Sequence, residues 1–117
     1  MHTTDPLTAV FGALADPTRR AILAKLSQGE ATVSELAEPF HLAQPTISKH
    51  LRVLESAGLI ETGRDAQRRP RRLARGSLRI ADAWLQPFRE QWERRLDRLE
   101  AHLDKKASSS DRKAGPR

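Results

Sequence analysis

The segment "AQPTISKHLRVLESAGLI", residues 43–60, predicts a helix with two very different faces. At about 100° per residue, Ile47, Leu51 and Leu54 fall together on one side, which indicates a packed face. Gly58 follows as a residue suited to the left-handed conformation that ends many helices. The opposite side carries a different set of residues: Gln44, Pro45, Ser48, Lys49 and Arg52. This second face is either exposed to solvent, a docking surface for a protein partner, or a surface that enters the groove of a nucleic acid.

A shorter helix is predicted just before this segment. Thr32 and Glu35 have the spacing of a capping box, and Pro39 closes the helix after about two turns. Residues 40–43 then connect the two helices. Two short helices joined by a turn of three or four residues are the outline of a helix-turn-helix.

Two more helices are predicted upstream, and each opens with an Asp-Pro pair. Asp5 precedes a helix over residues 6–15, and Asp16 precedes a helix that ends before Gly29. Aspartate caps a helix N-terminus, and proline suits the first helical position. The sequence therefore predicts four helices before residue 58.

A basic β-hairpin is predicted after the fourth helix. Residues 59–64 and 70–75 have strand character, and residues 63–70 form the loop. Six arginines and two acids give residues 59–75 a local charge of +4. Such a hairpin beside a helix-turn-helix is the arrangement of a winged helix, in which the hairpin lies over phosphates or a minor groove. The predicted DNA contacts on this wing are Arg64, Arg68, Arg69, Arg71 and Arg72.

The helical period returns from about Ser77, and Pro87 is expected to break or restart the helix. Beyond it, apolar residues recur every three or four positions and form one seam: Phe88, Trp92, Leu96, Leu99 and Leu103. Residues 105–117 are polar, basic and rich in serine, and we expect a disordered tail there. The expected organisation is a flexible N-terminus over residues 1–5, one domain over residues 6–104, and this tail.

Composition narrows the functional classes. The 117 residues contain 21 Lys and Arg against 15 Asp and Glu, a formal charge of +6 that favours a polyanionic partner. The chain has no cysteine, which excludes thiolate catalysis and thiolate metal sites and makes a reducing cytoplasm the simplest location. No secretion signal or membrane-spanning run is recognisable, so a soluble protein is expected. No phosphate-binding glycine loop, nucleophile elbow or acid and base pair is present, which argues against an enzyme.

The polar face of the fourth helix suits a DNA major groove, which admits an α-helix and presents hydrogen-bonding groups at its base edges. Gln44 suits adenine, Lys49 suits guanine or a phosphate, and Ser48 suits a base or the backbone. Thr46 and Ser48 are small enough to let the helix approach closely. Arg52, one turn later, is better placed for a phosphate.

Three alternatives stay open for this face. It could be an ordinary solvated helix surface, or the docking face of a winged helix that acts as a protein-interaction module. The dense single-sign charge of the hairpin argues against a protein interface. RNA binding would require exposed aromatic residues for stacking, and the hairpin has none.

Three segments together resemble the ArsR-type (ArsR/SmtB) winged helix-turn-helix transcriptional regulators: "ALADPTRRAILAKL", "TVSELAEPFHLAQPTISKHLRVLESAGLI" and "WLQPFREQWERRLDRLEAHL". The resemblance covers about residues 7–103. It implies a mainly α fold with a small β-hairpin, in the order α-α-α-α-β-β-α(α), that dimerises through its terminal helices. It also implies a homodimeric, usually repressing, DNA-binding protein whose recognition helix begins at Gln44. A dimer that holds two recognition helices about 34 Å apart would read a palindromic operator with half-sites one turn apart. Where the family often has serine, this chain has Ala43, and the lost cap costs about 1 kcal/mol.

The metal-sensing branch of the family has cysteine pairs before the turn, or His and acidic ligands on the terminal helix. This chain has neither set, and His102 has Lys105 and Lys106 where partner ligands would lie. Because cations oppose a metal ion, we expect no metal and no cofactor. The remaining histidines are expected to be surface or partly packed residues: His2, His41 and His50.

The apolar seam of the terminal helix and the stripe of the first helix exceed what one winged helix can cover. An exposed stripe of this length predicts a partner surface, and a twofold homodimer is the commonest solution. The predicted interface residues are Val10, Phe11, Leu14, Trp84, Leu85, Phe88, Trp92, Leu96 and Leu99. The two tryptophans could equally be core residues, and a small-molecule effector site beneath them is the less favoured alternative.

Overall fold

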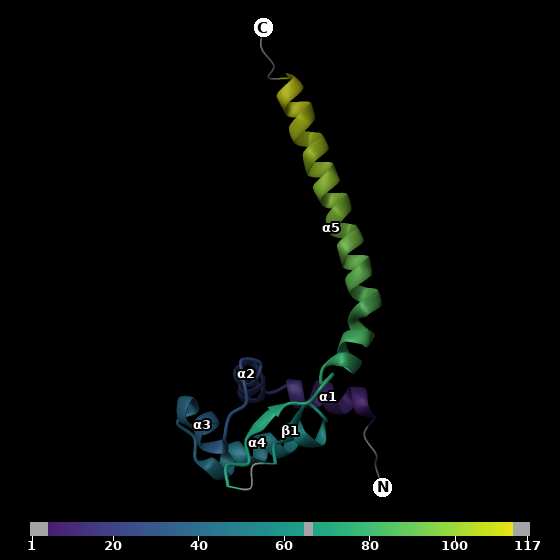
Figure 1. The fold of residues 1–117 in the computed structure, drawn as a ribbon. Helices are drawn as coiled ribbons and strands as arrows, with labels where there is room; N and C mark the ends of the chain where they lie inside the picture. Colours follow the sequence, from purple (N-terminus) through teal and green to yellow (C-terminus); the bar gives the residue numbers. More distant parts are fainter. Residues whose placement is uncertain (1–4, 65–66, 114–117) are drawn as a thin grey trace. The chain divides into compact units, whose positions relative to one another are not determined.

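The computed structural model describes residues 5–64 and 67–113, with side chains described as far as residue 108. The chain divides into two compact units, the first ending at Asp82 and the second beginning at Ala83. Figure 1 follows the elements in chain order. They are α1 (Pro6–Leu14), α2 (Pro17–Leu26), α3 (Val33–Ala37), the 3₁₀ turn η1 (Glu38–Phe40), α4 (Gln44–Ser56), β1 (Ile60–Thr62), β2 (Arg71–Leu73) and α5 (Arg79–Lys113).

The first three helices begin at the predicted caps. Asp5 accepts a hydrogen bond from the amide of Thr8, and Asp16 accepts one from the amide of Arg19, both at 3.0 Å. Thr32 and Glu35 form a complete capping box, with each side chain bonded to the other residue's amide. Each cap satisfies an amide that would otherwise lack a partner in the first helical turn.

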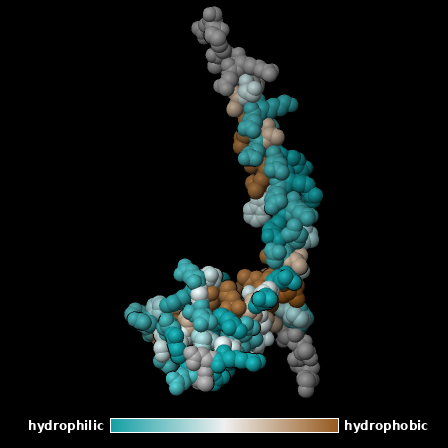
Figure 2. All heavy atoms as spheres, in the orientation of Figure 1, coloured by the Kyte–Doolittle hydropathy of each residue, from teal (hydrophilic) through white to brown (hydrophobic). Residues whose placement is uncertain are grey.

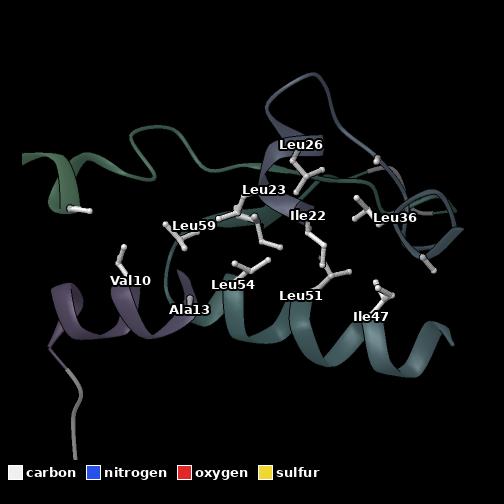
Figure 3. Close-up of a cluster of buried hydrophobic side chains, with 14 residues drawn as sticks. Val10, Ala13, Ile22, Leu23, Leu26, Leu36, Ile47, Leu51, Leu54 and Leu59 are labelled. Carbon is white, nitrogen blue, oxygen red and sulfur yellow. The ribbon is translucent and has the colours of Figure 1, made fainter. Parts of the chain in front are cut away.

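The core of the first unit lies between α4 and α2. Figure 3 shows Ile47, Leu51 and Leu54 pointing from α4 toward the α2 side chains, which include Ile22. All four side chains are buried, with at most 1% of their surface exposed. Burying one such aliphatic side chain contributes about 1.5–3 kcal/mol, so this seam anchors α4. The predicted packed face of the helix is confirmed.

The turn between α3 and α4 contains more structure than the sequence predicted. The 3₁₀ turn η1 follows α3 directly, and His41 then takes a left-handed conformation with φ of 54°. That conformation ends the 3₁₀ turn and redirects the chain toward α4. Gly58, with φ of 77°, ends the α4 region as its sequence predicted.

The predicted hairpin is present with shorter strands. Strands β1 and β2 are antiparallel, and Ile60 pairs with Leu73. An isolated bridge joins Ala31 to Arg71, with amide-to-carbonyl distances of 3.0 and 2.7 Å. This bridge, which the sequence did not predict, fixes β2 to the segment that leads into α3.

The C-terminal segment differs from its prediction in two ways. Pro87 lies inside α5, so the expected break is wrong, and one helix runs from Arg79 to Lys113. Proline removes one backbone hydrogen bond, but the sequence on both sides favours a helix strongly enough to continue. The segment expected to be disordered from residue 105 is helical as far as residue 113, because no glycine or proline interrupts it before Gly115. Residues 114–117 and 1–4 of the expected flexible ends lie outside the described residues.

Candidate nucleic-acid interface

Helix α4 presents the six predicted recognition residues opposite its buried seam. Five of them are exposed and Ser48 is half-buried; the exposed ones are Gln44, Pro45, Thr46, Lys49 and Arg52. Ala43 provides no side-chain cap at the N-terminus of the helix, as its identity predicted. The first two and a half turns of α4 therefore offer short polar groups and two cations on an anchored helix.

Gln44 has a partner that sequence reasoning missed. Its side-chain nitrogen Nε2 donates a hydrogen bond to Oγ of Ser34, with 2.9 Å between the two atoms. Ser34 is the second residue of α3, ten positions upstream. No periodic pattern relates the two residues, because their contact depends on how α3 and α4 cross.

The two cations of α4 lie toward α1. Lys49 and Arg52 border a shallow groove of about 760 Å³ between α1 and α4, together with Ala9, Gly12 and Val53. Gln44, in contrast, adjoins α3 at the other end of the helix. The polar face of α4 thus has a neutral end beside α3 and a basic part beside α1.

A polar cluster links α4 to α2 behind the exposed face. Nη1 of Arg19 lies 3.4 Å from Nδ1 of His50, and Oδ2 of Asp16 lies 4.0 Å from the same nitrogen. Arg19 also donates from Nε to the carbonyl of Ala13 at 2.8 Å. The amide of Arg19, followed by the charges of His50 and Arg19, lowers the pKa of Asp16 below its ordinary value of 3.8. His50 is therefore a partly buried residue that connects α4 to α2, and Arg19 extends the cluster to the end of α1.

The wing arginines differ in their environments. Arg64 and Arg69 are exposed, and Arg69 has a left-handed backbone with φ of 46°. Arg72 pairs with Glu61 across the hairpin, with 2.7 Å between Nε and Oε1. Arg71 is half-buried on the face of β2 opposite Arg72, because successive residues of a strand point to opposite faces. Of the five predicted contacts, Arg71 is thus the one whose side chain is least available.

Arg68 connects the wing to the helix-turn-helix. Its Nη2 lies 3.5 Å from Oε1 of Glu35, the capping-box residue of α3. Hydrogen bonds from the amide and hydroxyl of Thr32, and then the charges of Arg68 and Lys25, lower the pKa of Glu35 below its ordinary value of 4.5. Glu35 therefore stays ionised near neutral pH and holds Arg68 beside α3.

The predicted dimer residues fall into two groups. Val10 is 2% exposed and packs in the core, where its stripe on α1 faces α2 and α4, so its side chain offers almost no surface to the predicted interface. Leu14 is partly buried against the same core, whereas Phe11 is exposed.

The terminal helix α5 exposes its large apolar side chains, which Figure 2 shows as patches along the helix. Trp92 is 66% exposed, and the rings of Trp84 and Phe88 contact each other in a tilted arrangement with their centroids 4.8 Å apart. The other exposed members of this apolar seam are Leu85, Leu96, Leu99 and Leu103.

Neither a metal site nor a membrane span emerges from the residues that the structure describes. Among the side chains described in residues 5–64 and 67–108, no three His, Asp or Glu residues gather where they could hold a metal ion. None of the described helices is both long enough and apolar enough to cross a bilayer.

These features define a class of protein. A short helix, a tight turn, an anchored helix with an exposed polar face and a basic hairpin together form a winged helix-turn-helix. Residues 16–62 match the family model described as "Bacterial regulatory protein, arsR family". The chain belongs to this family.

Solved structures of the family support the assignment across most of the chain. A crystal structure of an ArsR family transcriptional regulator is 45% identical, covers 76% of this chain and 98% of its own, and superposes with a TM-score of 0.68. A winged helix-turn-helix DNA-binding domain from Mycobacterium bovis, described as homodimeric, is 32% identical with a TM-score of 0.60; the match covers 77% of this chain and 84% of that one.

Curated relatives match over half to two thirds of this chain. The transcriptional repressor SdpR of Bacillus subtilis (strain 168) is 45% identical over 58 residues, which are 50% of this chain and 64% of SdpR. A probable mercury resistance operon repressor of Streptomyces lividans is 37% identical over 78 residues, 67% of this chain and 61% of that protein. The chain thus spans about three fifths of the length of these two relatives.

Proposed function

We propose that this protein is a homodimeric transcriptional repressor that binds duplex DNA at a palindromic operator. The observation that carries the proposal is the exposed polar face of α4, which lies opposite a seam that is at most 1% exposed. An anchored helix can enter a major groove without repacking the core. The named repressors among its relatives support the same function.

Within this proposal, the two parts of the interface have different tasks. Gln44, Ser48 and Lys49 read base edges from the N-terminal half of α4, where recognition helices usually contact bases. Arg52 and the wing arginines bind phosphates, which adds affinity but little sequence choice. Arg72 can leave Glu61 for a phosphate at small cost, because an exposed ion pair contributes only about 0–1 kcal/mol.

The proposed dimer forms through the apolar seam of α5, aided by Phe11 of α1. A single helix cannot bury its own seam, and association of two copies removes it from water. Two recognition helices held about 34 Å apart would read half-sites one helical turn apart. The homodimeric Mycobacterium bovis domain supports this assembly.

The cellular location follows from the same proposal. A repressor must reach the chromosome, so we place it in the bacterial cytoplasm. A depression of about 470 Å³ runs along α5 beside Phe88, Trp92 and Leu96. One helix face cannot enclose a small molecule, so an effector there would require a second surface.

A selected-site experiment tests the function. The protein selects duplexes from a random-sequence library, and the enriched operator is then bound by the wild type and by Gln44→Ala and Arg69→Ala. Gln44→Ala should lose about 1–3 kcal/mol of discrimination at one base pair. Arg69→Ala should weaken all duplexes similarly and reduce the salt slope by about 0.9.

Arg98→Ala, which removes the same charge from α5, serves as the control for Arg69→Ala. Equal loss of discrimination in the Gln44 and Arg69 variants would contradict the division of tasks. A wild-type chain that enriches no sequence would contradict the proposed function itself.

A further inference from the structure

A hydrogen bond between the side chains of Ser34 and Gln44 links the two helices of the helix-turn-helix. Nε2 of Gln44 donates to Oγ of Ser34 over 2.9 Å, and both residues are exposed. Gln44 is the first residue of α4, where the N-cap Ala43 makes no side-chain hydrogen bond. The Gln44 carboxamide is therefore directed toward α3 rather than folded back to cap its own helix.

We infer that Ser34 is a positioning residue for DNA recognition: it holds the Gln44 carboxamide in the orientation that reads an adenine. This inference rests on the proposed function and assigns Ser34 a role in the same site. Ser34 reads no base itself and acts through Gln44.

The hydrogen-bonding capacity of the two groups permits this arrangement. A glutamine amide has two N–H donors and a carbonyl acceptor. One N–H is used by Ser34, which leaves the other N–H for N7 of adenine and Oε1 for the adenine N6 amino group. The serine hydroxyl accepts from Gln44 through an oxygen lone pair and so takes neither the second N–H nor the carbonyl oxygen of the carboxamide. The contact thus leaves the bidentate reading of adenine intact.

The α3 helix gives Ser34 a firm support. Thr32 and Glu35 close a capping box on either side of it, and Nζ of Lys25 donates to the carbonyl of Glu35 at 2.9 Å. Leu36 is fully buried in the core. Ser34 is therefore fixed by its helix before DNA binds, and the orientation that it imposes on Gln44 is already present in the free protein.

Holding the carboxamide in advance should increase affinity and selectivity. A free surface glutamine samples several rotamers, and binding must immobilise it. Immobilising one flexible side chain on binding weakens the affinity by about threefold to tenfold. Fixing the carboxamide before binding should therefore strengthen binding by the same factor. The gain should appear only at the base pair that Gln44 reads.

The experiment measures binding to the operator enriched from the random library, to the same operator with the Gln44-dependent adenine replaced by 7-deazaadenine, and to an unrelated duplex. The variants are Ser34→Ala, Gln44→Ala and the double variant, with Ser34→Thr to restore the hydroxyl. Ser56→Ala, an exposed serine at the far end of α4, is the matched control.

Ser34→Ala should weaken operator binding about threefold to tenfold and reduce the penalty of 7-deazaadenine, while binding to the unrelated duplex and the unfolding midpoint stay unchanged. Ser34→Thr should restore discrimination, and Ser34→Ala should have no further effect when Gln44 is already alanine. Additive effects of the two substitutions, or equal weakening on every duplex, would overturn the inference and leave Ser34 as a separate phosphate contact. If the wild type enriches no operator, the proposed function fails and the inference fails with it.

Discussion

Helices α4 and α5 carry similar apolar stripes, yet the structure treats them in opposite ways. In α4, Ile47, Leu51 and Leu54 are at most 1% exposed. In α5, Trp92 and Leu99 are 66% and 53% exposed. A stripe of apolar residues at helical spacing therefore predicts that a surface will be buried, but it does not say whether the same chain or another molecule covers it.

The largest effect is expected from equal truncations on the two helices. Leu51→Ala should cost about 2–5 kcal/mol of unfolding free energy, because it leaves a cavity in a packed core. Leu99→Ala removes the same atoms from an exposed position and should destabilise the fold of the chain much less. Urea denaturation followed by circular dichroism measures both.

Protein concentration separates the two variants further. Dimerisation stabilises a chain by mass action, so the effect of Leu99→Ala should shrink on dilution. The loss in Leu51→Ala should persist at every concentration, because the cavity lies within one chain. Equal losses in the two variants under dilute conditions would show that the chain itself covers the α5 stripe.

The next effect concerns the proposed dimer. Trp92→Glu places a charge in the middle of the apolar seam, where desolvation opposes its burial. We expect monomers by light scattering and weak operator binding, because a single recognition helix loses the second half-site. Arg94→Glu, which changes charge on the opposite side of α5, should remain dimeric. A Trp92→Glu protein that is still dimeric would place the interface elsewhere.

The parts of the fold that sequence predicted correctly depend on local chemistry. Asp16 and Thr32 cap their helices because their side-chain oxygens accept hydrogen bonds from backbone amides. The donor amide lies only three residues away, so the neighbouring sequence is enough to predict the cap. The buried side of α4 follows from its period alone. The error at Pro87 is also local, because the helix preference of the flanking residues outweighs the cost of one lost hydrogen bond.

The parts that sequence did not predict depend on distant segments. The bridge from Ala31 to Arg71 spans forty positions, and it buries part of an arginine that the charge pattern had assigned to DNA. The contact of Ser34 with Gln44 depends on the crossing of two helices. Composition identified the wing as basic, but only its strand register shows that Arg72 faces Glu61.

The smallest effect tests how the wing is joined to α3 through Glu35. The pKa of this carboxyl lies below its ordinary value of 4.5 in the folded protein, chiefly because Thr32 donates hydrogen bonds to it. A lowered pKa means that the ionised form stabilises the fold above pH 4.5 and that this contribution is lost as the pH falls through the folded value. The unfolding midpoint of Glu35→Gln should therefore fall less steeply on acidification than that of the wild type.

The comparison between these two proteins isolates Glu35, because Asp5 and Asp16, whose pKa values are also lowered, are present in both. Near neutral pH, Glu35→Gln should be slightly less stable, since glutamine keeps the capping geometry but loses the charge that attracts Arg68. The two midpoints should converge in acid, where the wild-type carboxyl is protonated. Parallel curves over the whole range would mean that Glu35 contributes through its shape alone, and that its charge does not hold the wing beside α3.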